Sequence, residues 1–321
     1  MTTATAELAT RVGITVEPIN GFIGAELKGV DLSRALSDDE FAVIHDAFVR
    51  YEVIVMRNQN ITFEQQMAFG ERFGQLTVHP FAANHDDHRE LIVFDNTPDN
   101  PPVSTDCWHS DETFRACPPT ATILRCVTAP QRGGDTLFSS MTAAYRGLSE
   151  DMQRYLHTKT ATHDFKPWRP MFNTRELRER LWQIEERFPT PHHPVIRVHP
   201  VTGRRVLFVN SQFTNSIDGL KPDESAAILD YLYRQASIPE YQLRVKWEPN
   251  MMVAWDNRST QHYASYDYYP QPRKMERVTT QGEPVLGVEG AYEPERIDGN
   301  GMIMPKPKKP AGGRTREFER L

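Results

Sequence analysis

The sequence predicts a mainly β protein with flanking helices, in which short strands form a barrel or a sandwich. Two observations support this prediction. In the final third of the chain, residues 241–247, 251–255 and 273–280 are strand-like runs separated by turns. In the first third, two helix-start signals flank an apolar run of strand length, which indicates helices packed on a sheet.

The chain opens with a predicted pair of short strands. Residues 14–18 and 22–27 alternate apolar and polar side chains, and Gly21 stands at the turn between them. A third strand is expected at 53–56, where Val-Ile-Val-Met is apolar throughout, as buried strands are.

Two helices are predicted from capping boxes, in which the N-cap residue and the residue three positions later each bond to the other's backbone. Ser37 and Glu40 begin the first helix. Thr62 and Gln65 begin the second, which we expect to end at Gly74.

The middle of the chain contains a polar segment at 86–106 that is broken by prolines, apart from an apolar strand at 91–94. Long connections of this kind often carry function, so the segment is a candidate mobile lid. The other elements predicted here are a strand at 120–127, a tight turn at 133–136 leading into a strand at 137–138, a strand at 205–210 and a helix at 222–236.

Two segments are expected on the outside of the molecule. A charged helix at 175–188 is interpreted as an insertion outside the barrel, with a purely structural solvated helix as the alternative. The tail at 288–321 is rich in Pro, Gly, Lys and Arg, so it is expected to be loosely held or to pack on the body or on a partner subunit. Residues 1–287 then form a single domain.

Composition limits the function classes. The 321 residues carry a net charge of −6 with both signs interspersed, which argues against nucleic acid as a partner. Three cysteines without metal-site spacing (Cys107, Cys117 and Cys126) predict a reducing compartment and a cytoplasmic protein. We see no secretory signal and no apolar run of membrane-spanning length, so we expect a soluble protein with no membrane partner. We also expect a homo-oligomer, either a dimer or a tetramer.

His109 and Asp111 are candidate metal ligands. Side chains at i and i+2 of an extended segment point to the same side, so these two can bind one ion while Ser110 points away. A second histidine completes a 2-His-1-carboxylate facial triad, which leaves one face of Fe(II) open. His262, just after the apolar strand at 251–255, is the candidate. Taken alone, His-x-Asp also fits a simple hydrogen bond in an ordinary loop.

Arg273 and Arg277 share one face of the last predicted strand, whereas Glu276 lies on the other. Two guanidinium groups then enter one cavity, and each needs an anion because burying an unpaired charge is costly. The planar guanidinium matches a carboxylate through two parallel hydrogen bonds, so an acidic ligand fits. The alternative is that both arginines pair with aspartate or glutamate side chains of the chain itself.

Four motifs in order carry a family resemblance. They are W-H-S-D-x-x-F at 108–114, G-G-D-T at 133–136, W-D-N-R-x-x-x-H at 255–262 and P-Q-x-R-x-M-x-R-V-T at 270–279. From residue 14 to residue 287 the chain resembles the taurine dioxygenase family and its relatives, the 2,4-dichlorophenoxyacetate dioxygenases. The resemblance implies a double-stranded β-helix core, which is a cupin-like jelly roll. It also implies Fe(II) as cofactor, 2-oxoglutarate as co-substrate and O₂ as oxidant.

Residue by residue, the resemblance implies His109, Asp111 and His262 as the iron ligands. It implies that Arg273 binds the distal carboxylate of 2-oxoglutarate and that the hydroxyl of Thr136 donates to the same molecule.

For the substrate, the resemblance implies that His79 and Arg277 bind an anionic group. Asn257 and Arg258 are expected to have a structural role in the turn before the second histidine ligand.

Two departures from the taurine-type pattern concern the substrate pocket. Glu112 replaces an apolar residue, and Ala82 stands where an aromatic residue is expected. One account of Glu112 is an exposed ion pair with Arg115, which contributes little. The other is substrate binding, in which the carboxylate selects a substrate with an amine or hydroxyl groups at that end and its acid at Arg277.

The function implied by the resemblance is hydroxylation of a small anionic organic substrate (a sulfonate, sulfate ester or carboxylic acid), with conversion of 2-oxoglutarate to succinate and CO₂. An alternative is hydroxylation of an amino acid or a natural-product intermediate to a stable alcohol. Other classes are a zinc hydrolase, which requires neither Arg273 nor Thr136, and a non-catalytic barrel that binds a small acid, which the complete ligand set disfavours. The intact Asp111 disfavours a halogenase.

Overall fold

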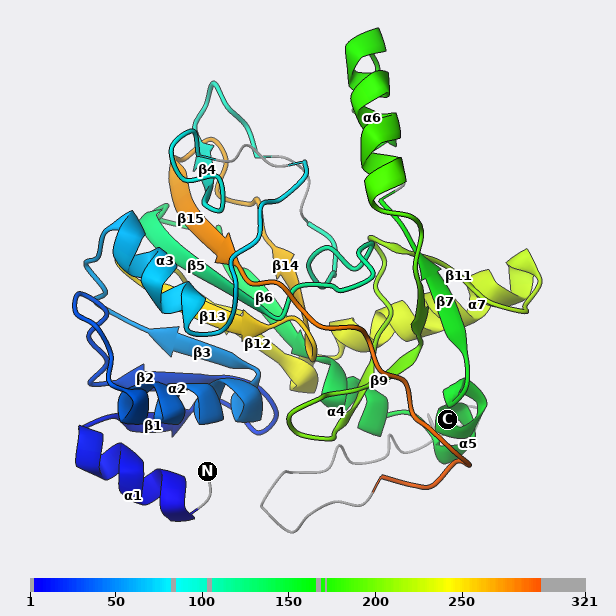
Figure 1. Cartoon of the computed structure of the whole chain (residues 1–321), viewed down its shortest axis with the longest axis horizontal. Coiled ribbons are helices and arrows are strands. Elements are labelled where there is room, and N and C mark those ends of the chain that lie inside the picture. Colours follow the sequence, from blue (N-terminus) through cyan, green and yellow to red (C-terminus); the bar gives the residue numbers. More distant parts are fainter. Residues whose placement is uncertain (1–2, 82–84, 103–105, 166–168, 171, 296–321) are drawn as a thin grey trace, which may run out of the picture.

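The computed structural model describes residues 3–81, 85–102, 106–165, 169–170 and 172–295. Its largest element is a seven-stranded sheet (Figure 1). In spatial order the strands are β1 (Thr15–Pro18), β2 (Ala25–Lys28), β3 (Val53–Met56), β13 (Met252–Asp256), β5 (Ala121–Thr128), β15 (Arg273–Thr279) and β4 (Ile92–Asn96). Neighbouring strands are antiparallel except β2 and β3, which are parallel.

A three-stranded sheet packs against one face of the large sheet. Its order is β12 (Gln242–Val245), β6 (Thr136–Ser140) and β14 (Thr260–Ala264). Side chains of both sheets form one buried cluster, which includes Val53, Val55, Leu124, Phe138, Leu243, Val253, Trp255 and Met275. The structure therefore confirms the mainly β architecture with a jelly-roll core.

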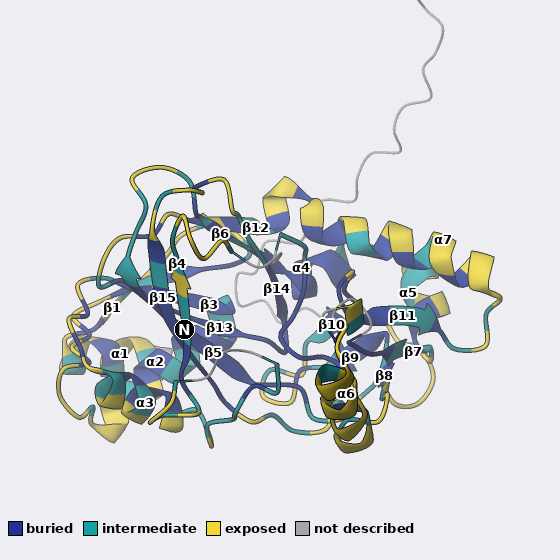
Figure 2. Cartoon of the chain, turned by 90° about the horizontal axis from the view of Figure 1, so that it is seen from above, coloured by how far each residue is buried: buried dark blue, intermediate teal, exposed yellow. Residues whose placement is uncertain are grey.

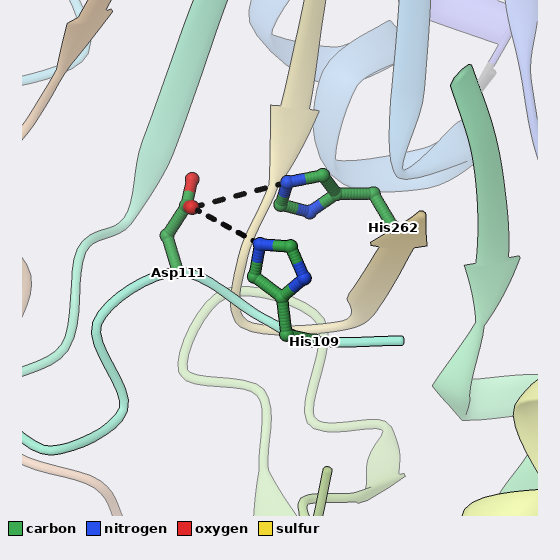
Figure 3. A group of neighbouring side chains, drawn as sticks. All are labelled: His109, Asp111 and His262. Atoms are coloured by element: carbon green, nitrogen blue, oxygen red, sulfur yellow. Dashed lines mark ion pairs between the residues drawn. The ribbon is translucent and has the colours of Figure 1, made fainter. Parts of the chain in front are cut away.

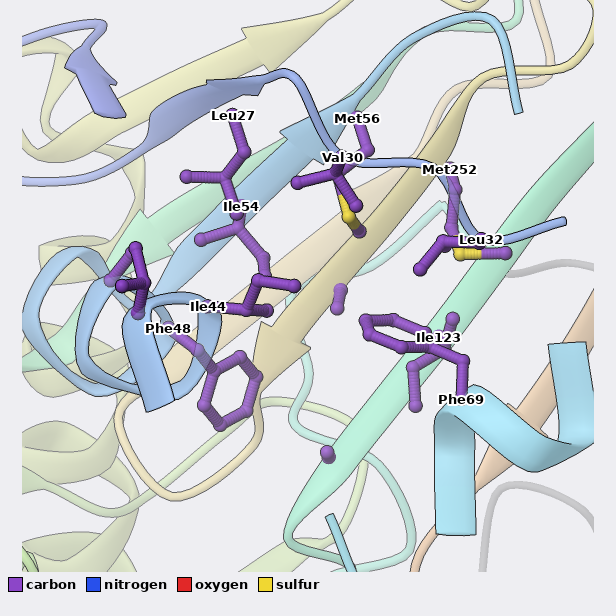
Figure 4. Packing of buried hydrophobic residues seen from close by; sticks show 14 of the residues in the cluster. Leu27, Val30, Leu32, Ile44, Phe48, Ile54, Met56, Phe69, Ile123 and Met252 are labelled. Carbon is purple, nitrogen blue, oxygen red and sulfur yellow. The ribbon is translucent and has the colours of Figure 1, made fainter. Parts of the chain in front are cut away.

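Helices α1 (Thr3–Val12), α2 (Asp38–Tyr51) and α3 (Phe63–Glu71) contribute to the core on the other face of the large sheet. Figure 4 shows Ile44 and Phe48 of α2 and Phe69 of α3 in this core. Successive side chains of β3 point to opposite faces of the sheet, so this strand contributes to two hydrophobic clusters. Ile54 belongs to the cluster under these helices, and Val55 belongs to the cluster between the two sheets. Both predicted capping boxes are present, at the N-caps Ser37 and Thr62.

The rest of the chain forms smaller sheets and helices beside the jelly roll. Their bounds are β7 (Thr160–His163), β8 (His192–Pro194), β9 (Ile196–Val198), β10 (Arg205–Leu207), β11 (Thr214–Ile217), α4 (Met141–Arg146), α5 (Glu150–Leu156), α6 (Arg175–Arg187) and α7 (Pro222–Tyr233), with 3-10 helices at η2 (Arg234–Ser237) and η3 (Pro239–Tyr241). The charged helix α6 extends away from the body in Figure 1 and is mostly exposed in Figure 2. Its Trp182 side chain is 66% exposed.

Several element boundaries differ from the sequence prediction. The strand predicted from residue 22 begins at Ala25, because the side-chain carbonyl of Asn20 accepts the backbone N–H groups of Phe22 and Ile23 and bends the chain. The strand predicted at 205–210 is shorter and ends at Leu207. The second predicted helix ends at Glu71, where a tighter turn takes over, and the helix predicted at 222–236 continues beyond Tyr233 as 3-10 helix.

The predicted tail begins with residues that contact the body. Glu295 forms an ion pair with Arg146 at 2.7 Å, and His157 Nε2 lies 3.0 Å from the carbonyl oxygen of Gly290. Residues 296–321 lie outside the described part of the chain. No helix within the described residues has the length and hydropathy needed to cross a bilayer. The domain division, the oligomeric state and the cytoplasmic location stay predictions.

Candidate active site

The three candidate metal ligands meet where two distant segments join. His262 lies on β14, and its backbone exchanges two hydrogen bonds with that of His109, at 2.8 and 3.1 Å. Asp111 follows on the same loop, and its Oδ1 lies 3.9 Å from Nε2 of each histidine (Figure 3). This separation is too long for the simple His–Asp hydrogen bond. One ligand atom from each residue lies within 4.8 Å of the others, so the three can hold one ion.

The three side chains are in protonation states that suit a metal. Nδ1 of His109 lies 2.9 Å from the carbonyl oxygen of Cys107, which can only accept, so Nδ1 carries the proton and Nε2 keeps its lone pair. Burial lowers the pKa of His109, and it lowers the pKa of His262 to about 3. Burial alone would raise the pKa of Asp111, but neighbouring positive charges, Arg277 foremost, hold that pKa well below its usual range. Two neutral imidazoles and a carboxylate fit Fe(II).

Four other histidines of the described residues have partners outside the triad. His199 contacts Asp256, His192 contacts Asp218, His163 contacts the side chain of Thr113, and His193 contacts the carbonyl oxygens of Thr113 and Arg115.

The triad lines a cavity of about 360 Å³. All eight residues predicted for the site line it: His79, His109, Asp111, Glu112, Thr136, His262, Arg273 and Arg277. The predicted lid also contributes, through Asp95, Asn96, Asn100, Pro101 and Pro102. Residues 103–105 of this segment and Ala82 lie outside the described residues, whereas Phe81 lines the cavity.

Arg273 is 7% exposed and lies beside two aromatic rings, with its guanidinium carbon 6.0 Å from the Trp247 ring centroid and 5.6 Å from that of Tyr268. Its Nε donates to the carbonyl oxygen of Gly134 at 3.2 Å. No ion pair in the described part of the chain involves Arg273, so no protein carboxylate there neutralises it. Neither aromatic neighbour was predicted from the sequence, although Trp247 ends a predicted strand.

The G-G-D-T turn brings the backbone close to Arg273. Gly133 and Gly134 have φ angles of 74° and 72°, in the left-handed region that favours glycine. A Cβ on Gly133 would lie 2.7 Å from Asp267 Oδ1, and one on Gly134 would lie 3.3 Å from Arg273 Cδ. The turn leads into Thr136, whose hydroxyl oxygen accepts from Trp247 Nε1 at 2.9 Å. The Thr136 hydroxyl proton can therefore be donated into the cavity.

Arg277 has an internal partner. Its Nη1 donates to Asp111 Oδ1 at 3.2 Å, while its Nε has no hydrogen-bond partner among the described residues. The alternative that an arginine pairs with a carboxylate of the chain itself therefore holds for Arg277, and it does not hold for Arg273 among the described residues.

His79 presents a hydrogen-bond donor to the cavity. Its Nδ1 accepts the backbone N–H of Phe81 at 3.1 Å, so the proton of the neutral ring lies on Nε2. Burial lowers the pKa of His79, which favours this neutral form.

Glu112 has features of both interpretations drawn from the sequence, which were an ion pair with Arg115 and contact with the substrate. Its Oε2 pairs with Arg115 Nη2 at 2.6 Å, but the side chain is only 2% exposed, so the pair is buried rather than exposed. Its Oε1 has no hydrogen-bond partner among the described residues and lies 4.0 Å from Nε2 of His79. A φ of 46° shows that the backbone is strained here for a residue with a Cβ.

Comparisons with known proteins agree with this geometry. The family model "Taurine catabolism dioxygenase TauD, TfdA family" matches residues 15–279. The chain is 34% identical to the alpha-ketoglutarate-dependent sulfate ester dioxygenase of Pseudomonas putida, over 86% of this chain and 92% of that protein. It is also 34% identical to the alpha-ketoglutarate-dependent sulfonate dioxygenase of Saccharomyces cerevisiae, over 84% of this chain and 67% of that protein.

A solved structure shows the same fold. The crystal structure of a taurine dioxygenase from Burkholderia xenovorans matches with a TM-score of 0.73 at 35% identity, covering 87% of this chain and 95% of that one. The family uses Fe(II), 2-oxoglutarate and O₂, and the buried His-Asp-His cluster is a fitting place for the metal. The fold, the site and the sequence matches together show that the chain belongs to the taurine catabolism dioxygenase TauD, TfdA family of 2-oxoglutarate-dependent dioxygenases.

Proposed function

We propose that this dioxygenase hydroxylates a small anionic organic substrate, such as a sulfonate, a sulfate ester or a carboxylic acid, in the cavity beside His109, Asp111 and His262. The observation that carries the proposal is the placement of Arg273 and Arg277 in one cavity with this triad, with Asp111 as the one internal carboxylate that pairs with either arginine among the described residues. When bound, Fe(II) with 2-oxoglutarate and O₂ supplies the oxidising chemistry, and 2-oxoglutarate becomes succinate and CO₂.

Each arginine is assigned a different acidic ligand, either 2-oxoglutarate or the substrate. Arg273, with Thr136 beside it, is assigned to 2-oxoglutarate because its charge has no protein carboxylate partner among the described residues. Arg277 and the Nε2–H group of His79 are assigned to the substrate anion. The relatives named for sulfate esters and sulfonates, which are both anionic, support this choice.

A substrate panel tests the proposal. Sulfonates, alkyl sulfates, aryloxyacids and amino acids are compared by the succinate formation that each stimulates, with a matched neutral alcohol as control. We expect simple anions to stimulate turnover more than neutral analogues. Stimulation by amino acids alone, with a stable alcohol as product, would favour the alternative function, and a zinc hydrolase would release no succinate.

Replacing Arg277 by leucine is expected to weaken substrate binding about 30-fold or more, since truncating one partner of a buried charge pair costs roughly 2 kcal/mol or more. The KM for 2-oxoglutarate should change little. Because Arg277 also contacts Asp111, Mn(II) affinity is measured alongside both KM values. A variant with a raised KM for 2-oxoglutarate and an unchanged KM for substrate would show that the assignment of Arg277 is wrong.

Glu112 is proposed to set selectivity at the His79 end of the cavity. An anion bound to Nε2 of His79 would lie close to Glu112 Oε1, which is 4.0 Å from that nitrogen, and like charges repel. The anion assigned to His79 and Arg277 is therefore bound more favourably when the same substrate also offers a hydroxyl or an amine to Glu112, which offsets this repulsion. Glu112→Gln keeps the shape of the side chain and removes its charge. We therefore expect kcat/KM for simple sulfonates and aryloxyacids, relative to that for hydroxyl- or amine-bearing acids, to rise about tenfold over the parent protein, which corresponds to roughly 1.4 kcal/mol.

The matched control for Glu112→Gln is Arg115→Gln, which breaks the same ion pair but keeps the carboxylate. An identical preference order in the parent protein and in Glu112→Gln would leave Glu112 with a structural role only.

A further inference from the structure

Asp111 is held by a hydrogen-bond network that lies behind it. The hydroxyl of Thr122, on β5, is 2.7 Å from Asp111 Oδ2. The side-chain amide nitrogen of Asn257, in the turn after β13, is 2.8 Å from that same hydroxyl oxygen. Asn257 Oδ1 accepts the backbone N–H of Asp111 at 3.3 Å and the indole N–H of Trp255 at 3.1 Å. Thr122, Asn257 and Trp255 are each 2% exposed or less.

The direction of every hydrogen bond in this network is determined. Two N–H donors fix one end of the Asn257 amide as the carbonyl, so its NH₂ group must point to Thr122. Thr122 receives that donor on its oxygen. Its single proton is then left for the carboxylate of Asp111, which can only accept when ionised.

The network engages one oxygen of Asp111 and leaves the other facing the histidines. Oδ2 is occupied by Thr122, whereas Oδ1 accepts from Arg277 Nη1 at 3.2 Å and lies 3.9 Å from the Nε2 atoms of His109 and His262. Without the Thr122 hydroxyl, Oδ2 would lose its hydrogen bond, and of the two contacts that orient the carboxylate only the longer one, from Arg277 to Oδ1, would remain.

We infer that Thr122 and Asn257 are positioning residues for the metal site. Thr122 binds Oδ2 so that Asp111 offers Oδ1 to the ion, and Asn257 orients Thr122 and the Asp111 backbone together. This inference rests on the proposed assignment of Asp111 as a metal ligand. It also explains the asparagine of the W-D-N-R motif, because Asn257 hydrogen-bonds both to the backbone of Asp111 and to Thr122 on β5.

The test uses Thr122→Val, which keeps the side-chain shape and suits a strand but removes the hydroxyl. Thr279→Val is the matched control, since Thr279 pairs with Thr122 across neighbouring strands, is buried, and has a hydroxyl without a hydrogen-bond partner among the described residues. Mn(II) affinity, measured by EPR without turnover, is expected to fall about 10- to 100-fold in Thr122→Val and to stay unchanged in Thr279→Val. Thr122→Ser restores the hydroxyl and should recover most of the affinity.

Two results would overturn the inference. One is Mn(II) binding in Thr122→Val as tight as in the parent protein. The other is an equal loss of affinity in Thr122→Val and Thr279→Val, which would indicate a general structural effect. If Thr122→Val does not fold, Thr122→Cys and Thr122→Ser are compared, because the thiol is a weaker donor and should bind Mn(II) less tightly. A His262→Ala variant that retains Mn(II) would instead refute the proposed metal site itself.

Discussion

Replacing His262 by alanine is expected to abolish Fe(II) binding and 2-oxoglutarate turnover together. The substitution removes one of three ligands from a buried site, and Asp111 and His109 alone cannot complete the facial triad. Loss of a group that only hydrogen-bonds to a metal ligand typically costs about 10- to 100-fold in metal affinity, so loss of a ligand itself should cost roughly 100-fold or more. Iron content after anaerobic loading and succinate formation are the two measurements.

A control for adventitious metal binding is His192→Ala. His192 lies beside Asp218 at the surface, where a histidine and a carboxylate could also attract an ion, and it lies outside the cavity. We expect this variant to bind one Fe(II) and to turn over as the parent does. Undiminished iron content and turnover in His262→Ala would contradict the assignment of the triad.

Arg273→Ala is expected to raise the 2-oxoglutarate requirement several hundredfold. Arg273 is buried, and no ion pair of the described residues involves it, so the co-substrate's distal carboxylate is its expected partner. Truncating a partner of a buried ion pair costs roughly 3–5 kcal/mol because the remaining charge is left uncompensated. The measurement is the KM for 2-oxoglutarate, with direct binding to the Mn(II)-loaded protein as a second readout.

Arg273→Lys tests whether the positive charge alone is sufficient or whether the planar guanidinium group is needed. Lysine keeps the positive charge but cannot make two parallel hydrogen bonds, so an intermediate requirement is expected. Mn(II) affinity without 2-oxoglutarate should match the parent in both variants, since Arg273 does not contact the triad. An unchanged 2-oxoglutarate requirement in Arg273→Ala would reassign the residue to a structural role beside Trp247 and Tyr268.

The sequence determined those features that depend on residues close together in the chain. The capping boxes at Ser37 and Thr62 formed as predicted, because each involves residues only three positions apart. Arg273 and Arg277 entered one cavity because side chains on a strand repeat every second residue. His109 and Asp111 lie two positions apart and contribute to one candidate metal cluster, and the ordered motifs indicated the family.

Only the tertiary structure decided which of these groups are paired. Arg277 contacts Asp111 and Arg273 contacts no carboxylate of the described chain, although the sequence pattern treats the two arginines alike. Glu112 pairs with Arg115 as the local spacing allowed, but its burial at 2% exposure follows from the packing around it. Thr122 and Asn257 carry no local signal of their contact with Asp111. Thr122 lies 11 positions along the chain from Asp111 and beyond a turn, and Asn257 lies 146 positions away and is brought there by the pairing of β13 with β5.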